Sequence, residues 1–584
     1  MEYNLNIEHK TSTTSAFKKM LQFMKEEKRN LIFAFLVMVL NAGLAMLAPY
    51  LIGYTIDHFI QNKDYQGLLT FSGILLVLYI VYSGTEYAQT KIMGSIGQRM
   101  LYSLRNSVFH KLQSLPIAFF NQNKAGDLIS RINNDTDKVN QFFSQSLMQF
   151  ANSIFTMIGA GIFLLSIHFE LGGAALIPGV FILVFVAIVS PLVKKKNALS
   201  MKSTGNLSAE IQESLANFKT IIAFNRRDYF QEKFELANQD NYKTSLSAGI
   251  MNNIFTPVFA LFSNIAQLIV LAFGIYLISI GNFTIGLLIS FIAYTNAFYQ
   301  PLRQLAALWA SFQTAMAAWD RISIILGLEN NLIQLDKIQV PSIENDSLLV
   351  FQNVSFQYPD GKKVLHHINF ELEKGKTYAL VGPTGGGKTT TASLMSRLYD
   401  PTDGKVFLKG QDIRSYKQEE LSQKIGFILQ EPFLFNGTVK DNILYGNETY
   451  KNLSEAELLT LLDEAELSNL MSKFEQGLNT EITSSGDSMS LGEKQILAFV
   501  RAFLRQPELL ILDEATANID TVTEKLLEEI LLKLPATTTK VIIAHRLNTI
   551  ENADEIFFVN SGEVVAAGTL DNALKLLLDG KRES

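Results

Sequence analysis

Cysteine is absent from all 584 residues of the sequence. A chain without thiols forms no disulfides, binds no metal through thiolates and has no cysteine nucleophile. Charged residues are also scarce, since they make up 18% of the chain, against about a quarter in ordinary soluble domains. The net charge of −6 and the lack of a basic, aromatic-rich patch give no indication of a nucleic-acid partner.

Long hydrophobic runs accompany this low charge. Hydrophobic residues make up 48% of the chain, and about 20 apolar residues are enough to cross a bilayer. The first run is too long and begins too late to be a cleavable signal peptide. We therefore expect an α-helical membrane domain over residues 30–320, with six transmembrane helices. The predicted spans are Leu31–Leu51, Leu68–Ala88, Leu147–Ile167, Gly173–Val193, Phe255–Ile280 and Ile285–Leu308.

The connections between the spans indicate the topology. Lysines and arginines gather before the first span, after the second and after the fourth. Because positively charged loops stay in the cytoplasm, we expect both termini to be cytoplasmic and the protein to lie in the cytoplasmic (inner) membrane. The connections at Gly172 and Gly281–Thr284 are very short, whereas residues 89–146 and 194–254 are long and helix-rich. The membrane helices are therefore predicted to continue well into the cytoplasm.

A phosphate-binding loop is predicted in the C-terminal third. Residues Gly382–Thr389 (GPTGGGKT) fit the pattern G-x-x-x-x-G-K-[ST], between an apolar strand at Tyr378–Val381 and a helix-forming stretch, Thr389–Leu398. Glycines let backbone N–H groups surround phosphates, and the lysine and the hydroxyl that follow it reach the β- and γ-phosphates and Mg²⁺. ATP or GTP is therefore the expected ligand. The predicted contacts are Gly382, Thr384, Gly385, Gly386, Gly387, Lys388, Thr389 and Thr390.

Two adjacent carboxylates end a later apolar strand, Leu509–Glu514. A buried strand needs neither charge, so a purely structural role explains them poorly. On a P-loop fold, Asp513 would hold the Mg²⁺ shell, and Glu514 would orient and deprotonate the attacking water.

Four further motifs resemble those of ATP-binding cassette (ABC) proteins. Met489–Gln495 (MSLGEKQ) resembles the L-S-G-G-Q signature, and Gln430, His545 and Tyr358 match the Q-loop, the switch histidine and the adenine-stacking aromatic. Alone, a tyrosine before proline or a single histidine is more often structural; the order of all these motifs favours an α/β P-loop ABC ATPase domain over residues 348–584. The resemblance implies that Glu514, His545 and Gln430 are catalytic. It also implies that Thr389, Gln430 and Asp513 bind Mg²⁺, and that Tyr358, Ser490, Gly492 and Asp520 contact ATP.

The resemblance to ABC exporters covers nearly the whole chain. It begins at an amphipathic elbow helix, Ala16–Phe23, within a cytoplasmic N-terminus (residues 1–29), and includes a linker at residues 321–347. Pro116–Phe120 and Ala223–Arg227 resemble parts of the two cytoplasmic loops that end in coupling helices. Phe119 and Phe120 either dock near the ATPase, as in the family, or anchor a helix bundle. In the family, two cassettes pair head-to-tail, so the resemblance implies a dimer that alternates between inward-open and outward-open states.

The chain departs from the family pattern at its signature. Leu491 replaces the first glycine and Glu493 replaces the glutamine, while Ser485 and Ala517–Asp520 also deviate. A side chain and a carboxylate there would crowd and repel a γ-phosphate. The pattern resembles the catalytically competent subunit of heterodimeric bacterial multidrug exporters, whose partner supplies a good signature. A homodimer that tolerates the altered signature remains the alternative.

The substrate is least determined. Two interpretations of the polar residues in the spans are open: they line a substrate cavity, or they form hydrogen bonds between helices. The aromatic residues of the sixth span either form a drug-binding wall or pack against other helices or lipid. Family membership favours lipophilic drugs or lipids. The alternatives are a homodimeric lipid or peptide exporter, an importer with the exporter fold, and a nucleotide-gated regulator. The polar candidates are Asn41, Glu86, Thr156, Asn264, Gln267 and Asn296, and the aromatic ones are Phe291, Tyr294, Phe298 and Tyr299.

Overall fold

The structure is a computed structural model that describes residues 3, 5, 27–330, 332–336, 347–359, 361–483, 489–513, 519–543 and 552–579. The chain divides into two compact units. The membrane unit comprises residues 8–113 and 126–327, and the cassette unit comprises residues 1–7, 114–125 and 328–584. The predicted elbow helix, Ser485, Glu514, Ala517 and His545 lie outside the described residues.

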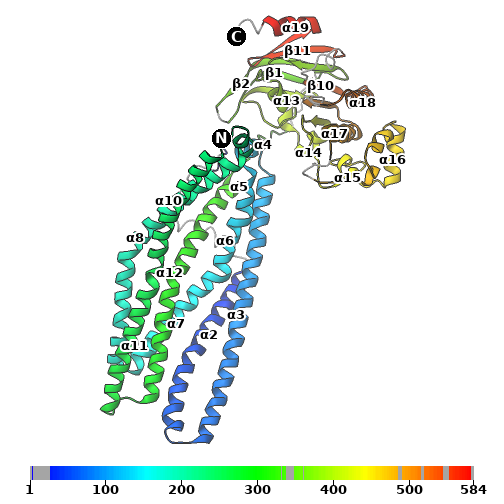
Figure 1. The fold of residues 1–584 in the computed structure, drawn as a ribbon. Helices are drawn as coiled ribbons and strands as arrows, with labels where there is room; N and C mark the ends of the chain where they lie inside the picture. Colours follow the sequence, from blue (N-terminus) through cyan, green and yellow to red (C-terminus); the bar gives the residue numbers. More distant parts are fainter. Residues whose placement is uncertain are drawn as a thin grey trace. The chain divides into compact units, whose positions relative to one another are not determined.

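The membrane unit consists of long helices (Figure 1). Five helical stretches of the described residues are long and apolar enough to cross a membrane. The sixth predicted span lies in the last long helix, several of whose side chains are outside the described part of the chain. The long helices are α2 (Lys28–Thr55), α3 (Tyr65–Gln113), α7 (Leu147–Ile167), α8 (Phe169–Ala216), α10 (Arg227–Asn253), α11 (Phe255–Ser279) and α12 (Ile285–Gly327).

The membrane helices continue beyond the length of a bilayer, as predicted, and their cytoplasmic orientation stays a prediction. Helices α3 and α8 have 49 and 48 residues, more than twice the roughly 20 that a bilayer requires. Helix α12 continues to Gly327, so residues 321–327 of the expected linker are helical. The shorter pieces of this unit are η2 (Ile56–Ile60), α5 (Ala125–Ser130), η3 (Arg131–Asp135), α6 (Thr136–Gln141), η4 (Phe142–Ser146) and α9 (Phe218–Ala223).

The connection expected at Gly172 is at His168 instead. His168 has extended backbone angles (φ −152°, ψ 109°), and its ring accepts a hydrogen bond from the Leu171 N–H at 3.2 Å, which caps α8. Gly172 lies inside α8, where a Cβ would come within 2.4 Å of the Leu164 carbonyl oxygen. The glycine therefore permits close approach of two helices rather than a turn.

Aromatic residues of α12 pack inside the membrane unit. Phe291 and Tyr294 are fully buried, and the Tyr294 hydroxyl donates to the Met46 carbonyl oxygen at 2.6 Å. Tyr299 likewise donates to the Ala175 carbonyl oxygen at 2.7 Å. These contacts support the packing interpretation of these three side chains over a drug-binding wall.

Three of the polar candidates also bond between helices. The buried Asn41 side chain of α2 donates to the Thr85 hydroxyl of α3 at 2.9 Å, and Gln267 donates to Asn296 at 2.5 Å. Glu86 is exposed on α3.

Two larger sheets build the cassette unit (Figure 1). An antiparallel sheet has the strand order β2-β1-β4-β5, and the central sheet has the order β12-β11-β3-β10-β9-β6. In the central sheet, β11, β3, β10, β9 and β6 run parallel, and β12 pairs antiparallel with β11. The strands are β1 (Ser347–Gln357), β2 (Lys363–Glu373), β3 (Thr377–Val381), β4 (Asp403–Leu408), β5 (Gln411–Asp412), β6 (Ile425–Ile428), β9 (Leu509–Asp513), β10 (Thr539–Ile543), β11 (Glu555–Asn560) and β12 (Glu563–Gly568), with β7 (Gly437–Thr438) and β8 (Glu481–Ile482) forming a small separate pair.

The helices of this unit belong to different hydrophobic clusters. Helix α13 packs with both sheets, whereas α15 to α18 form a second cluster on one side of the central sheet. The expected signature helix, α17, and the P-loop helix, α13, therefore sit in separate parts of the core. The helices are α4 (Ile117–Gln122), α13 (Lys388–Met395), α14 (Gln418–Lys424), α15 (Val439–Ile443), α16 (Glu455–Glu464), α17 (Leu491–Arg505), α18 (Thr521–Leu532) and α19 (Leu570–Asp579).

Candidate active site

The predicted ATP-site residues converge on one edge of the central sheet. The P-loop follows β3, Asp513 ends β9, and Gln430 lies two residues beyond β6. Ile543, at the end of β10, pairs with Leu380 of β3 and with Asp513 of β9. Strand β10, which precedes His545 in the sequence, therefore ends between these two strands. Because the carboxyl ends of parallel strands meet at one edge, ligands of such sheets bind there. The sequence prediction of a single site is consistent with this topology.

Glycine is required by the backbone of the P-loop. Gly382, Gly385 and Gly387 have φ values of 149°, 83° and 117°, which are strained for any other residue. At Gly382 a Cβ would also come within 2.0 Å of the Val559 carbonyl oxygen. The loop leads directly into α13, whose N-terminal N–H groups favour an anion. The loop is therefore shaped for phosphate.

The side chains that follow the loop fit a magnesium nucleotide. Lys388 is 6% exposed, and its Nζ donates to the carbonyl oxygens of Gly382 and Pro383 at 2.9 and 3.1 Å, which holds the ammonium group beside the loop. The Thr389 hydroxyl lies 3.4 Å from an Asp513 carboxylate oxygen. Hydroxyl and carboxylate oxygens are ligands that Mg²⁺ prefers. Bound Mg²⁺ would neutralise phosphate charge. Glu514, the predicted base, directly follows Asp513 in the sequence.

Tyr358 lies beside the P-loop helix. Its hydroxyl is 3.0 Å from the Thr390 hydroxyl, in the first turn of α13. Its ring meets Phe356 and Tyr399 edge-on, with centroids 4.8 and 5.4 Å away. The ring is thus held in one orientation next to the phosphate site, where the adenine contact is predicted.

The signature serine is held by its own helix. Ser490 caps α17, and its backbone N–H and hydroxyl both donate to one Glu493 carboxylate oxygen, at 2.7 and 2.9 Å. The Glu493 N–H donates back to the Ser490 hydroxyl oxygen at 3.3 Å, which completes a capping box. A carboxylate therefore occupies the N-terminus of this helix, where the family resemblance places a phosphate contact.

The neighbouring predicted contacts also have partners within the chain. Gly492 lies against Thr523, because a Cβ there would come within 3.1 Å of the threonine methyl group. Asp520 caps α18 by accepting hydrogen bonds from the Val522 and Thr523 N–H groups and the Thr523 hydroxyl. The hydrogen bonds from Thr523 lower the pKa of Asp520. An additional nucleotide contact of Asp520 remains a prediction.

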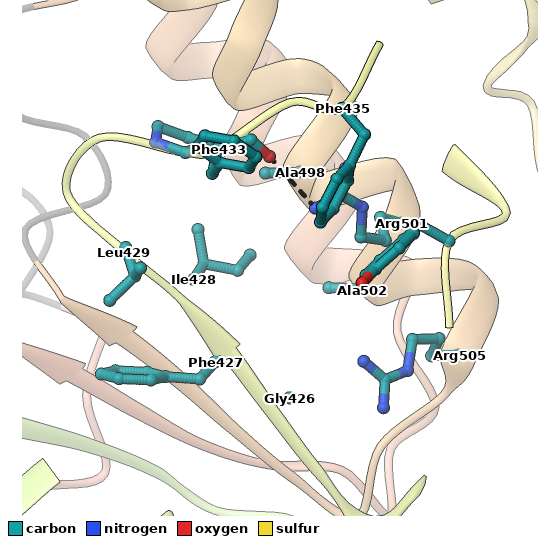
Figure 2. A pocket seen from close by; sticks show the side chains of 12 residues that line it. Gly426, Phe427, Ile428, Leu429, Phe433, Phe435, Ala498, Arg501, Ala502 and Arg505 are labelled. Atoms are coloured by element: carbon teal, nitrogen blue, oxygen red, sulfur yellow. Dashed lines mark hydrogen bonds between the residues drawn. The ribbon is translucent and has the colours of Figure 1, made fainter. Parts of the chain in front are cut away.

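Sequence reasoning missed an apolar pocket beside the Q-loop (Figure 2). Its volume is about 220 Å³. Phe435 stacks on Tyr445 at 4.0 Å, and the Arg501 guanidinium lies 5.5 Å from the Tyr445 ring centroid. Burial lowers the pKa of Arg501 and Arg505, and neither forms an ion pair with another described residue. The lining is Gly426, Phe427, Ile428, Leu429, Pro432, Phe433, Phe435, Tyr445, Ala498, Arg501, Ala502 and Arg505.

A sequence signal for this pocket did exist. Phe433 and Phe435 follow Gln430 closely in the sequence, and the structure shows that both are exposed although they are large and apolar. Exposed aromatic residues close together indicate a surface that receives another side chain. Tyr399 was also missed; it directly follows the helix-forming stretch after the P-loop.

The chain belongs to the ABC transporter family, with a fused transmembrane region and ATPase domain. The family described as ABC transporter transmembrane region matches residues 31–302, and the family described as ABC transporter matches residues 365–517. The protein is therefore a multi-pass membrane protein with the exporter fold, and it binds ATP and hydrolyses it to drive transport.

Three relatives show the extent of the similarity. The chain is 33% identical to the uncharacterized ABC transporter ATP-binding protein YfiC of Bacillus subtilis, over 96% of this chain and 92% of the relative. It is 30% identical to a fatty acid ABC transporter ATP-binding/permease protein of Mycobacterium bovis, over 87% and 80%. It is also 30% identical to a multidrug resistance ABC transporter ATP-binding and permease protein of Lactococcus lactis, over 85% and 83%.

Proposed function

We propose that this protein exports lipophilic compounds, either drugs or lipids, across the cytoplasmic membrane, and that Mg²⁺-ATP is hydrolysed at the cytoplasmic cassettes. Relatives named for fatty acid transport and multidrug resistance support this substrate class. The membrane unit supports it as well, because the predicted spans contain few ionisable side chains.

The observation that carries the ATPase part is the P-loop edge. Lys388, Thr389 and Asp513 lie together there, with the hydroxyl and carboxylate oxygens 3.4 Å apart. Lys388 would bind the β- and γ-phosphates, Thr389 and Asp513 would hold Mg²⁺ together with Gln430, and Glu514 would accept a proton from the attacking water. His545 would orient the γ-phosphate and the water. Positioning and charge neutralisation, without a covalent intermediate, suffice for this reaction.

We further infer that the working unit is a heterodimer. Helix α17, which Ser490 caps, packs in a different cluster from α13, so a second cassette is needed to bring a signature to this P-loop. The Glu493 carboxylate would repel the γ-phosphate of the partner's ATP, whereas this chain's own P-loop and Asp513 are intact. The partner would then supply an intact signature to the ATP of this chain.

The direction of transport is tested in inverted membrane vesicles that carry the protein with any partner from its native membranes. ATP-dependent accumulation of a lipophilic dye or a labelled phospholipid is the expected result, because the vesicle interior corresponds to the outside of the cell. ATP-dependent loss from preloaded vesicles would indicate import. ATP-dependent ion current without accumulation would indicate a nucleotide-gated pore.

A further inference from the structure

The first residues of the chain contact a cytoplasmic loop segment in the cassette unit. Tyr3 and Leu5 are 2% and 6% exposed. The Tyr3 N–H donates to the Gln122 side-chain oxygen at 2.8 Å, at the end of α4. The Tyr3 ring meets the fully buried Phe119 ring edge-on, with centroids 6.2 Å apart. Figure 1 shows the N-terminus beside α4.

A single amide side chain fixes the backbone of this segment. The Asn123 side-chain oxygen accepts from the Leu5 N–H at 3.2 Å, and its nitrogen donates to the Tyr3 carbonyl oxygen at 2.9 Å. The same nitrogen donates to the Phe119 carbonyl oxygen at 2.8 Å. An amide offers a donor and an acceptor side by side, so it pairs with a peptide backbone much as a neighbouring strand does. The contact is therefore directional and goes beyond apolar burial.

The same residues are tied to the chain that enters the cassette. The Tyr3 hydroxyl donates to the Glu329 carbonyl oxygen at 3.1 Å. Next to it, the Asn330 side chain donates to the Ser114 carbonyl oxygen at 3.0 Å. The Arg397 guanidinium then donates to the Ile333 carbonyl oxygen at 2.9 Å. Tyr3 thus joins the loop segment 114–125 to the segment that follows α12.

The loop segment also reaches the predicted adenine contact. The Asn121 side chain donates to the Tyr399 hydroxyl at 2.8 Å. The Tyr399 ring meets the Tyr358 ring edge-on, and the Tyr358 hydroxyl is hydrogen-bonded to Thr390 at 3.0 Å. A continuous series of contacts therefore runs from Tyr3 through α4 to the ring beside the P-loop. The placement of α4 here also shows that Phe119 packs at the cassette rather than in the helix bundle.

We propose that Tyr3 and Leu5 form a brace that holds loop segment 114–125 against the cassette, so that a change at Tyr358 on ATP binding is passed to the membrane helices. The brace is a positioning element, since its described contacts are with α4, Asn123 and Glu329. This inference rests on the proposed ATP-driven transport cycle. Without the brace, ATP would still bind and be hydrolysed, but α4 would follow the nucleotide state poorly.

The test measures conformational coupling in the full transporter, purified with any native partner. Because the chain has no cysteine, Leu69→Cys and Ile280→Cys give the only labelling sites in this chain. Spin-label distances between them are recorded without nucleotide and with ATP plus vanadate, beside the ATPase rate and the KM for ATP. In Tyr3→Ala we expect about a tenfold smaller population shift on adding ATP and vanadate, with the ATPase rate and KM within about twofold of wild type.

Graded variants separate a brace from a simple stabilising contact. Tyr3→Phe keeps the ring against Phe119 and loses one hydrogen bond, so it should keep most of the shift. Asn123→Asp loses the hydrogen bonds that Asn123 donates to the Tyr3 and Phe119 carbonyl oxygens, so it should lose the population shift as Tyr3→Ala does. This variant keeps the test valid if Tyr3→Ala fails to fold. Leu532→Ala, at an 80% exposed cassette position, is the control and should behave as wild type.

The outcomes are distinct. A lower melting temperature with an unchanged shift in Tyr3→Ala and Asn123→Asp would overturn the brace and leave a merely structural contact. A loss of ATP affinity in step with the shift would also overturn it, because the residues would then act on the ATP site itself. If the wild-type transporter shows no ATP-dependent shift at all, the proposed transport cycle fails instead.

Discussion

At the residue scale, the ATP site separates side chains that the backbone requires from those that the chemistry requires. Gly382 and Gly387 adopt positive φ, and they lie beside β11 and β2, respectively. Their role is therefore to shape the loop. Lys388, Thr389 and Asp513 bring charge and oxygen atoms to the same edge. Each group predicts a different failure on substitution, since loss of shape disturbs folding and loss of charge disturbs binding.

Replacing the P-loop lysine tests binding. Lys388→Ala should weaken ATP affinity by about tenfold or more, because it removes a cation at the phosphate site. Calorimetry with ATP measures the change, and Lys409→Ala, which removes an ion pair with Glu508 elsewhere in the cassette, is the control. An unchanged Kd would contradict the P-loop prediction.

Replacing the carboxylate after Asp513 tests the chemistry. Glu514→Gln should lower the ATPase rate by about a hundredfold or more while ATP binding persists, because the amide cannot accept the proton of the attacking water. Phosphate release and nucleotide binding are measured together. Glu529→Gln, at an exposed position of α18, should leave both unchanged. Retained hydrolysis would point to another base.

The signature carboxylate can be tested against a matched capping box. Glu493→Gln keeps a side chain that can cap α17 but removes its charge, so ATP turnover should rise about tenfold at the site this chain completes for its partner. Glu457→Gln alters the same arrangement on α16, where Ser454 and Glu457 form an identical box, and should not change turnover. The ATPase rate is measured in the dimer with the partner's own site active. A fall or no change for Glu493→Gln would remove the electrostatic argument for asymmetry.

At the element scale, a partly buried ion network joins α5 and η3 to α12. Asp127 accepts from Arg131 at 2.8 Å and from Arg321 at 2.5 Å, and Arg321 lies 3.2 Å from Asp135. Arg131 is 3% exposed and Asp135 is 1% exposed. Arg131 also donates to the Arg321 carbonyl oxygen at 2.8 Å. The charges of α5 and η3 therefore hold the C-terminal end of α12 in one register.

Removing Arg321 takes away one of the two cations that face the buried Asp135, while Lys138 remains 3.2 Å from the carboxylate. Arg321→Met should destabilise the membrane unit by about 2 kcal/mol, as expected for loss of a hydrogen-bonded charge pair that is partly buried. The melting temperature in detergent is the measurement. Arg105→Met, which breaks an exposed pair with Asp137, should cost less than about 1 kcal/mol. Equal losses for the two variants would show that burial does not strengthen the network.

At the scale of the whole molecule, the altered signature of this chain predicts that the transporter contains two different subunits. The tagged chain, purified from its native membranes, should elute at equal stoichiometry with a second ABC half-transporter that has an intact signature and an altered catalytic glutamate. Mass spectrometry identifies what elutes. Elution of this chain alone as a dimer with ordinary ATPase activity would show instead that two altered signatures are tolerated.

The sequence by itself determined the parts of this protein that depend on local pattern. Apolar runs identify membrane helices because a bilayer admits no unpaired backbone groups, and the P-loop glycines identify a phosphate site because only glycine adopts their backbone angles. Lys388, Thr389 and Asp513 were predicted at one nucleotide site because the glycine loop follows one apolar strand and Asp513 ends another, as on a P-loop fold. The family resemblance added the remaining cassette motifs.

Tertiary structure decided which residues far apart in the sequence meet. A glycine at 172 suggested a turn, yet the helix break is at His168, and Gly172 lets α7 and α8 approach. Tyr294 could line a cavity or pack, and its bond to Met46 favours packing. Tyr3, Asn121 and Tyr399 carry no local pattern that predicts their contacts, because long-range hydrogen bonds depend on the fold and leave no periodic trace in the sequence.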